Sequence, residues 1–403
     1  MNDKLYKANG QQLNVGGGSA SSVPASGVSV ASGTGLNSTN AQAAFKEVKD
    51  LIDLASGGTT FVEHGLTKRA ASLTDGQSLD MTEYPQHNYA GDRVTLGCHI
   101  TTLDKIIICF GHGKAMGSAS SEFTSKWFEI DSTNVKLYTQ TYNSSSSPGS
   151  PSLIETKAHG LTISQMLHCD ILINDEYKAE VQMMSVGAVA TKMTFNNFDS
   201  QKQGLIQVVS DGSTLTDVTF SAANEKFQYP CWVFGASQEA RWIPILNGMG
   251  YHKYLANSMP GRSTSGMMTD CQRALAFGRP KYVLVCCSND GTDLQTTQTR
   301  LNAFIALGLQ YGFEVLTIVR PNTPLTITPD NPTGTNNNQA KREWVQSLGI
   351  RYVDWGKATS ADSDDNNAGY AGFIGGDGVH YTTLGATSVA LQTLEDFPEI
   401  KML

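Results

Sequence analysis

The chain has little charge and no long apolar run. Of its 403 residues 16% are charged, and the formal net charge is −8. Nucleic-acid binding requires clustered Lys and Arg, which do not occur, so we expect no nucleic-acid partner. The most apolar stretch, residues 106–110, is far shorter than the roughly 20 residues that a membrane-spanning helix needs, and we expect no membrane insertion. The first residues lack the apolar segment typical of signal peptides, so no signal peptide is expected.

Cysteine and histidine do not occur in metal-binding or disulfide patterns. The seven cysteines are irregularly spaced and include no C-x-x-C pair. Neither a disulfide framework nor a structural zinc site is therefore expected, and reduced thiols fit synthesis in a cytosol. Apart from His380, the histidines show no ligand spacing with acidic residues. No glycine-rich loop has the helix and Lys of a phosphate-binding loop. We expect no metal and no cofactor.

Residues 1–57 combine a linker-like segment with a helical one. Small and polar residues dominate up to position 38, so this part has almost nothing to bury. After Asn40, a good N-cap residue, apolar residues alternate at spacings of four and three from Ala41 to Ala55. This spacing predicts either the seam of a short coiled coil or a solitary amphipathic helix lying on a neighbouring sheet.

Residues 86–228 are predicted to form an all-β sandwich. Three hairpin signatures lie at 127–138, 171–184 and 205–220, each with turn residues in the middle. Strands at this spacing predict two packed sheets. A scaffold role and a glycan-binding role for the sandwich are both open.

Residues 229–403 change to short apolar runs that alternate with helical patterns. The apolar runs lie at 231–234, 254–256, 282–285, 315–319 and 352–354, and the helical patterns at 266–277, 293–311, 339–348 and 384–394. Alternating units of this size predict a parallel sheet covered by helices. Because ligands bind at the carboxyl ends of the strands in such sheets, the residues directly after each strand are candidate site residues.

The segments after these strands contain the parts of a serine hydrolase. Ser237 follows the first strand at a strand-to-helix turn, His380 can take its proton, and Asp377 can hold the imidazole tautomer. The backbone N–H groups of Ser237 and Gly261 and the side-chain amide of Asn289 can stabilise a developing oxyanion. Each signal alone is common. Their order at the ends of successive strands carries the prediction.

Three further residues are candidate substrate contacts: Arg262, Ser288 and Asp290. Arg262 directly follows the oxyanion glycine, but a surface ion pair would explain it as well. Arg241 is a candidate for the border of the pocket, whereas Trp242 beside it is expected in the core.

Residues 229–403 resemble the SGNH, or GDSL-type, hydrolase superfamily. The most specific match is the run Asp-Gly-Val-His at 377–380 with Gly385 beyond it. The resemblance implies a flavodoxin-like α/β/α domain that hydrolyses esters through an acyl-enzyme. It places the family roles on Ser237 as nucleophile, on Gly261 and Asn289 as oxyanion donors, and on the C-terminal pair Asp377 and His380.

Two positions depart from the family pattern. The usual Gly-Asp-Ser is Gly-Ala-Ser at 235–237, and the usual Gly-x-Asn-Asp is Cys-Ser-Asn-Asp at 287–290. In the family this Asp mainly supports the nucleophile turn, so Ala236 is expected to leave the turn without that support. Cys287 in place of the family Gly is expected to narrow the pocket beside Asn289.

Residues 26–45 resemble a junction that recurs in tail-fibre and tailspike proteins of bacteriophages. In those proteins a strand leads into a Leu-x-x-Thr-Asn-x-Gln-x-Ala helix, and residues 36–44 match that pattern. The resemblance implies a homotrimeric virion appendage that binds other tail proteins through its N-terminus. Such a protein is made in the host cytoplasm and acts outside the cell.

The expected fold class is therefore multidomain, with an N-terminal helical and linker segment, a central jelly-roll-like all-β sandwich and a C-terminal α/β/α hydrolase domain. The expected function is a carbohydrate O-acetylesterase of a phage tail that acts on acetylated bacterial surface glycan. Two alternatives stay open: a catalytically inert receptor-binding or structural tail protein, and a cellular carbohydrate esterase without a virion role.

Overall fold

The structure is a computed structural model, and its described residues belong to one compact unit, residues 59–403. It describes residues 59–62, 64–85, 90–112, 123–142, 149–163, 165–176, 178–186, 190–196, 198, 205–258, 263–286, 294–319, 338–359, 372–376 and 380–401. The linker and helix predicted within residues 1–57 lie outside this part of the chain.

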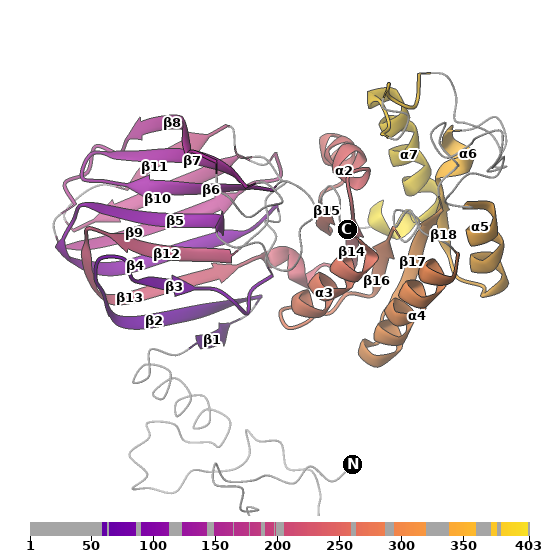
Figure 1. The fold of residues 1–403 in the computed structure, drawn as a ribbon, viewed down its shortest axis with the longest axis horizontal. Helices are drawn as coiled ribbons and strands as arrows, with labels where there is room; N and C mark the ends of the chain where they lie inside the picture. The colour runs from indigo at the N-terminus through magenta and orange to yellow at the C-terminus, as the bar shows by residue number, and fades with distance from the viewer. Residues whose placement is uncertain are drawn as a thin grey trace, which may run out of the picture. The chain divides into compact units, whose positions relative to one another are not determined.

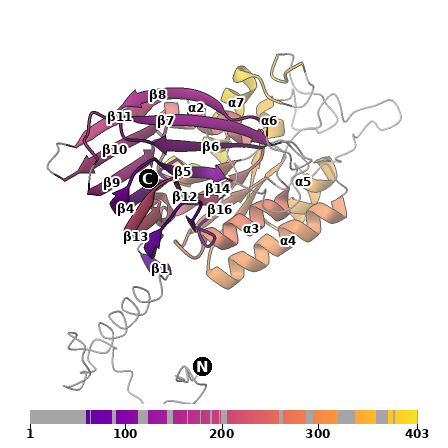
Figure 2. The same ribbon diagram turned by 60° about the vertical axis from the view of Figure 1, so that its left-hand side comes forward.

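Two antiparallel sheets contain most of the strands (Figures 1 and 2). The seven-stranded sheet consists, in spatial order, of β1 (Thr59–Val62), β2 (Gly65–Leu73), β13 (Thr214–Ala223), β4 (Arg93–Thr102), β9 (Met166–Ile173), β10 (Ala179–Ser185) and β11 (Thr191–Phe195). The six-stranded sheet consists of β3 (Ser78–Asp80), β12 (Leu205–Asp211), β5 (Lys105–His112), β6 (Phe123–Ile130), β7 (Asn134–Tyr142) and β8 (Ser152–Ala158).

Alternating side chains explain why these two sheets pack against each other. In β9, Leu167 and Ile171 are fully buried, whereas His168 between them is only partly buried. In β5 of the other sheet, Ile106 and Ile108 are fully buried as well, and they belong to the same hydrophobic core. Successive residues of a strand point to opposite faces, so each sheet has one apolar face to bury.

Two of the three predicted hairpins are confirmed and the third is wrong. β6 pairs with β7, and β9 pairs with β10, both antiparallel. β12 and β13, by contrast, lie in different sheets: β12 pairs with β3 and β5, and β13 with β2 and β4. The chain crosses between the sheets at Gly212, which has a φ of 66°, and at Ser213, whose hydroxyl donates to the Lys105 carbonyl at 2.8 Å. Alternation could not reveal the crossing, because both strands bury one face in the same core.

The apolar runs after residue 230 form a five-stranded parallel sheet. Its order is β15 (Leu255–Ser258), β14 (Cys231–Gly235), β16 (Tyr282–Val285), β17 (Glu314–Val319) and β18 (Tyr352–Asp354). The helices are α2 (Glu239–Gly248), α3 (Thr264–Ala274), α4 (Leu294–Tyr311), α5 (Asn338–Ser347), α6 (Trp355–Thr359) and α7 (Thr383–Asp396), with short 3₁₀ helices at η2 (Glu225–Gln228) and η4 (Pro398–Lys401). Among the described residues, no helix has the length and apolar character needed to span a membrane.

The predicted fold class is wrong. The described chain is mostly β, with two antiparallel sheets beside a parallel sheet and few helices, and it does not separate into a jelly-roll-like sandwich and a C-terminal flavodoxin-like α/β/α domain. The reason is a shared core: Tyr84, Phe227 and Phe277 pack ring against ring at 5.3–6.0 Å and belong to a cluster that also holds Trp232 of β14. Periodicity shows which face of an element is buried, but not which element covers it.

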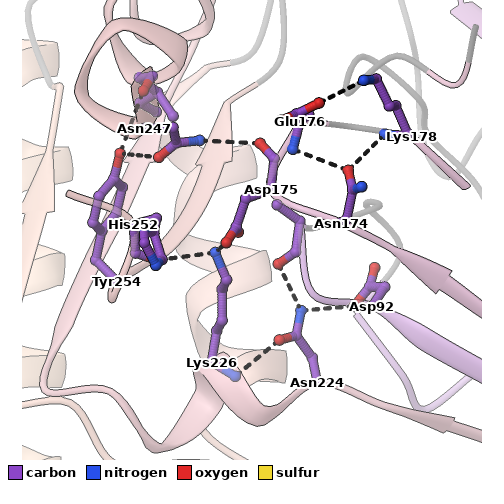
Figure 3. Close-up of polar contacts among 12 residues, drawn as sticks. Asp92, Asn174, Asp175, Glu176, Lys178, Asn224, Lys226, Asn247, His252 and Tyr254 are labelled. Carbon is purple, nitrogen blue, oxygen red and sulfur yellow. Dashed lines mark hydrogen bonds and ion pairs between the residues drawn. The ribbon is translucent and has the colours of Figure 1, made fainter. Parts of the chain in front are cut away.

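Polar contacts also connect the antiparallel sheets to the part of the chain that forms the parallel sheet and its helices (Figure 3). The buried Lys226 of η2 donates to the Asp175 carboxylate, which lies in the turn between β9 and β10, and to the His252 carbonyl at 3.0 Å. Asn247 in α2 donates to the Asp175 carbonyl at 3.4 Å and accepts from the Tyr254 hydroxyl at 2.9 Å. The β9–β10 turn therefore contacts the end of the helix that begins next to the candidate site.

Candidate active site

Ser237 lies just beyond the carboxyl end of β14. All five residues of β14 are buried, which explains its uninterrupted apolar run, and Ala236 and Ser237 come directly after it. β14 has β15 on one side and β16 on the other, so the chain leaves β14 toward one edge of the sheet and later continues toward the opposite edge. In open parallel sheets, this reversal at the carboxyl ends of the strands is where ligands bind.

His380 lies beside Ser237. Its Nε2 atom is 2.9 Å from the Ser237 Oγ atom, and both residues are partly buried. A hydroxyl that donates to Nε2 requires the tautomer with the proton on Nδ1, and that neutral imidazole can accept the serine proton. The contact joins the candidate nucleophile and the candidate base that the sequence predicted.

The turn before Ser237 is held by Glu239, the first residue of α2. The Glu239 side chain is fully buried, and its Oε2 atom accepts the Ala236 N–H at 2.5 Å. A Cβ atom on Gly235 would lie 2.0 Å from the Glu239 Cγ atom, so only glycine fits at that position. Glu239 thus supplies a carboxylate contact to the turn although position 236 is Ala.

The segment that carries His380 is held by a short antiparallel bridge. Tyr381 pairs with Ile374, the Gly375 N–H donates to the His380 carbonyl at 2.7 Å, and the Thr382 N–H donates to the Phe373 carbonyl at 2.9 Å. Thr382 then caps α7 by accepting the Gly385 N–H. These contacts hold the backbone of His380 two residues before Thr382, the N-cap of α7.

Gly385 is needed for the same arrangement. A Cβ atom there would lie 2.2 Å from the Phe373 carbonyl oxygen, so a side chain would push α7 away from residues 372–376. The glycine that stood out in the sequence beyond the Asp-Gly-Val-His run therefore has a packing role next to His380.

Two side chains near the start of α2 contact the backbone after His380. Gln238 Oε1 accepts the Tyr381 N–H at 3.2 Å, and Arg241 Nη1 donates to the Tyr381 carbonyl at 3.2 Å. The Tyr381 ring is buried edge-on against Trp355, which packs in the same way on Trp242. Trp242 is thus in the core, as predicted. Gln238 and Glu239 could not be recognised from the sequence, because no motif or periodicity distinguishes them from other residues of a helix start.

The other predicted site residues lie outside the described part of the chain. They are Asp377, Gly261, Arg262, Ser288, Asn289 and Asp290. Their roles therefore stay predictions.

Among the described residues, neither Cys231 nor a cluster of potential metal ligands provides a second reactive centre. Burial, with a smaller contribution from Glu399, raises the pKa of Cys231 at the start of β14 to about 12. At neutral pH this thiol is protonated, which makes it a poor nucleophile. Within the described residues, no group of three or more His, Cys, Asp or Glu side chains is placed to hold a metal ion.

Comparison with known proteins yields distant structural likeness only. No protein-family model matches the chain, and no curated protein matches it. A GDSL-like lipase from Bacteroides thetaiotaomicron is similar at 15% identity, with 43% of this chain and 89% of that chain covered and a TM-score of 0.33. A member of the lipolytic protein G-D-S-L family from Veillonella parvula is similar at 15% identity, with 42% and 97% covered and a TM-score of 0.31.

A third solved structure covers more of the chain. Protein YXIM from Bacillus subtilis is similar over 83% of this chain and 80% of its own, at 9% identity and a TM-score of 0.35. At these identities and TM-scores, the likenesses assign neither a family nor an activity to the chain.

Proposed function

We propose that the chain is a serine esterase in which Ser237 is the nucleophile and His380 is the general base. The observation that carries this proposal is the 2.9 Å contact between Ser237 Oγ and His380 Nε2 at the carboxyl end of a parallel strand. A nucleophile and its base must lie within hydrogen-bond distance of each other, and this pair meets that condition.

The first half of the proposed reaction forms an acyl-enzyme. Ser237 Oγ attacks the ester carbonyl carbon while His380 Nε2 takes the hydroxyl proton, and Asp377 accepts from Nδ1 of the resulting imidazolium. The N–H groups of Ser237 and Gly261 and the Asn289 amide bind the oxyanion. Loss of one such donor typically lowers the rate about 10²- to 10³-fold. When the intermediate collapses, the ester C–O bond breaks and His380 gives its proton to the departing alcohol.

The second half regenerates the enzyme. Water attacks the acyl carbon as His380 removes its proton, and a second tetrahedral intermediate forms at the same donors. Its collapse releases the carboxylic acid and returns the proton to Ser237 Oγ. The proposed reaction involves no change of oxidation state: in each half one proton passes through His380, from Ser237 to the departing alcohol in the first and from water to Ser237 in the second.

The substrate we propose is an acetyl ester on a bacterial surface polysaccharide, and the setting is a bacteriophage tail appendage. The resemblance of residues 229–403 to GDSL-type hydrolases supports ester hydrolysis, and the resemblance of residues 26–45 to tail-fibre junctions supports the virion setting. Arg262, Ser288 and Asp290 are the proposed substrate contacts. The inert alternative depended partly on Ala236, and the Glu239 contact to the Ala236 N–H weakens that argument.

The test of the activity is acetate release from a chromogenic acetyl ester and from acetylated bacterial polysaccharide. We expect turnover by the native chain and loss of at least about 10³-fold in kcat for Ser237→Ala, because the nucleophile is removed. Ser265→Ala, which changes an exposed serine in the first turn of α3, is the matched control. Equal activity of native chain and Ser237→Ala would exclude Ser237 as nucleophile, and an inactive native chain would favour the binding-only alternative.

The test of the virion setting is the molar mass in solution, measured by light scattering. We expect the full chain to be a homotrimer, about three times its 43.3 kDa chain mass, because the helix predicted after Asn40 has the spacing of a coiled-coil seam. A chain lacking residues 1–57 is expected to be monomeric. A monomeric full chain would contradict the tail-appendage proposal without affecting the esterase proposal.

A further inference from the structure

Tyr381 directly follows the proposed base, and its two backbone edges are held by different parts of the chain. In the antiparallel bridge with Ile374, the hydrogen bonds use the His380 carbonyl and the Thr382 N–H. This pattern turns the N–H and the C=O of Tyr381 itself to the opposite side of the segment. There they would need partners, because unpaired backbone groups are costly to bury.

The partners are side chains of Gln238 and Arg241, not a further strand. Gln238 Oε1 accepts the Tyr381 N–H, and Arg241 Nη1 donates to the Tyr381 carbonyl, both at 3.2 Å. Gln238 is 1% exposed and is the residue directly after Ser237. The turn that carries the nucleophile therefore also holds the peptide that follows the base.

We propose that Gln238 and Arg241 are positioning residues that set the distance between Ser237 Oγ and His380 Nε2. Together with residues 373–375, they bind both edges of the segment on which His380 lies, so the backbone that carries the imidazole cannot move away from Ser237 without breaking one of these contacts. This inference rests on the proposed esterase function. As positioning residues, Gln238 and Arg241 contact the Tyr381 backbone and not the reacting atoms.

The positions of the Gln238 and Arg241 contacts explain why both are needed to hold the segment that carries His380. The Gln238 contact lies at the N–H next to the His380 carbonyl, and the Arg241 contact lies one peptide further along. On this edge of the segment, one hydrogen bond alone would let the backbone tilt about it, whereas two on successive peptides fix its direction. A misplacement of about 1 Å between reacting groups can lower a rate by about 10²-fold, so a pivot of this size matters.

The first experiment measures kcat and KM for substitutions at both positions. We expect Gln238→Met, which keeps the length of the side chain but removes the acceptor, to lower kcat by about 10- to 100-fold with KM changed less than about twofold. Arg241→Met is expected to lower kcat by about 3- to 10-fold, and Arg241→Lys, which keeps a donor, to recover most of that loss. A purely structural role would not separate kcat from KM in this way.

Gln392→Met is the matched control. Gln392 is a buried glutamine in α7, 7% exposed, and it contacts neither Ser237 nor His380 in the described hydrogen bonds. It is expected to keep the native kcat. If Gln238→Met kept the native kcat while Ser237→Ala abolished it, the positioning role would be excluded and the esterase proposal would stand.

The second experiment observes the imidazole directly and does not depend on turnover. Chains labelled with ¹⁵N-histidine are compared by NMR, with His380→Asn identifying the His380 ring signals. In Gln238→Met we expect the His380 ring nitrogens to move toward the shifts of a histidine without a serine contact, as they should in Ser237→Ala. Unchanged His380 shifts in Gln238→Met would overturn the inference even if the native chain proved to have no esterase activity.

Discussion

Gly235 has no room for a side chain, and the reason is the residue that holds the nucleophile turn. A Cβ atom at this position would overlap the Glu239 side chain, whose Cγ, Cβ and Cδ atoms would all lie within 2.5 Å of it. Glu239 is fully buried and already accepts the Ala236 N–H. It therefore cannot move aside without losing that contact.

We expect Gly235→Ala to lower both stability and activity. Overpacking at a buried site typically costs about 1–3 kcal/mol of unfolding free energy, and displacement of Glu239 should shift Ser237 as well. Gly248→Ala is the control, because the position at the end of the same helix has open space and alanine favours helix. Denaturant unfolding and the esterase assay measure both effects. Equal behaviour of the two variants would contradict the role assigned to Glu239.

At the scale of elements, Asp131 closes the β6–β7 hairpin. Its Oδ1 atom accepts the N–H groups of Thr133 at 2.8 Å and Asn134 at 2.7 Å, and its Oδ2 atom lies 2.8 Å from Lys136 Nζ. Burial acts to raise the pKa of Asp131, but the hydrogen bonds from Lys136, Thr133 and Asn134 outweigh it and hold the pKa well below its ordinary value. The charged form is therefore the one that stabilises the hairpin.

This lowered pKa predicts a pH-dependent contribution to stability. The contribution is complete above the unfolded pKa of about 3.9 and is lost as the pH falls toward the lower folded value. We expect Asp131→Asn to reduce the unfolding free energy by about 1–2 kcal/mol at pH 7 and by progressively less below about pH 4. Urea titrations of the native chain and of Asp131→Asn, at pH 7 and at a pH below about 4, measure the difference in unfolding free energy.

Glu176→Gln is the control for that measurement. Its ion pair with Lys178 is exposed on both sides, with side-chain exposures of 70% and 39%, so its removal should change stability by less than about 1 kcal/mol. A pH-independent effect of Asp131→Asn would show that the hairpin is stabilised by its backbone pairing and not by the carboxylate.

At the scale of the whole molecule, the antiparallel sheets and the parallel sheet depend on one another. Phe227 packs against Tyr84 from the first part of the described chain and against Phe277 and Trp232 from the last part. Lys226 and Asn247 add the polar contacts to the β9–β10 turn (Figure 3). Residues that share one core unfold together, because removal of one side exposes the other.

We therefore expect residues 59–403 to unfold in a single calorimetric transition. Phe227→Ala should move that one transition to lower temperature, since removal of a buried phenylalanine ring typically costs about 3–5 kcal/mol. Loss of near-ultraviolet circular dichroism and loss of esterase activity are expected at the same temperature. Two separate transitions, of which Phe227→Ala shifts one, would indicate two independently stable domains.

Local structure could be predicted from the residues alone. The β6–β7 and β9–β10 hairpins and the apolar run of β14 depend on neighbours along the chain, so alternation and turn residues were sufficient to find them. Ser237 and His380 could be named as candidate nucleophile and base because Ser237 directly follows a predicted strand and His380 lies in the Asp-Gly-Val-His run near the C-terminus. Their types and order carried that prediction.

Contacts between distant segments were decided only by the folded chain. Ser237 and His380 are 143 residues apart, and so are Gln238 and Tyr381, so no local pattern could show that they meet. The crossing of the chain from β12 to β13 and the core shared by Phe227 and Phe277 were unpredictable for the same reason. A period of two or of 3.6 residues encodes which face of an element is apolar, whereas the partner that covers this face depends on the packing of the whole molecule.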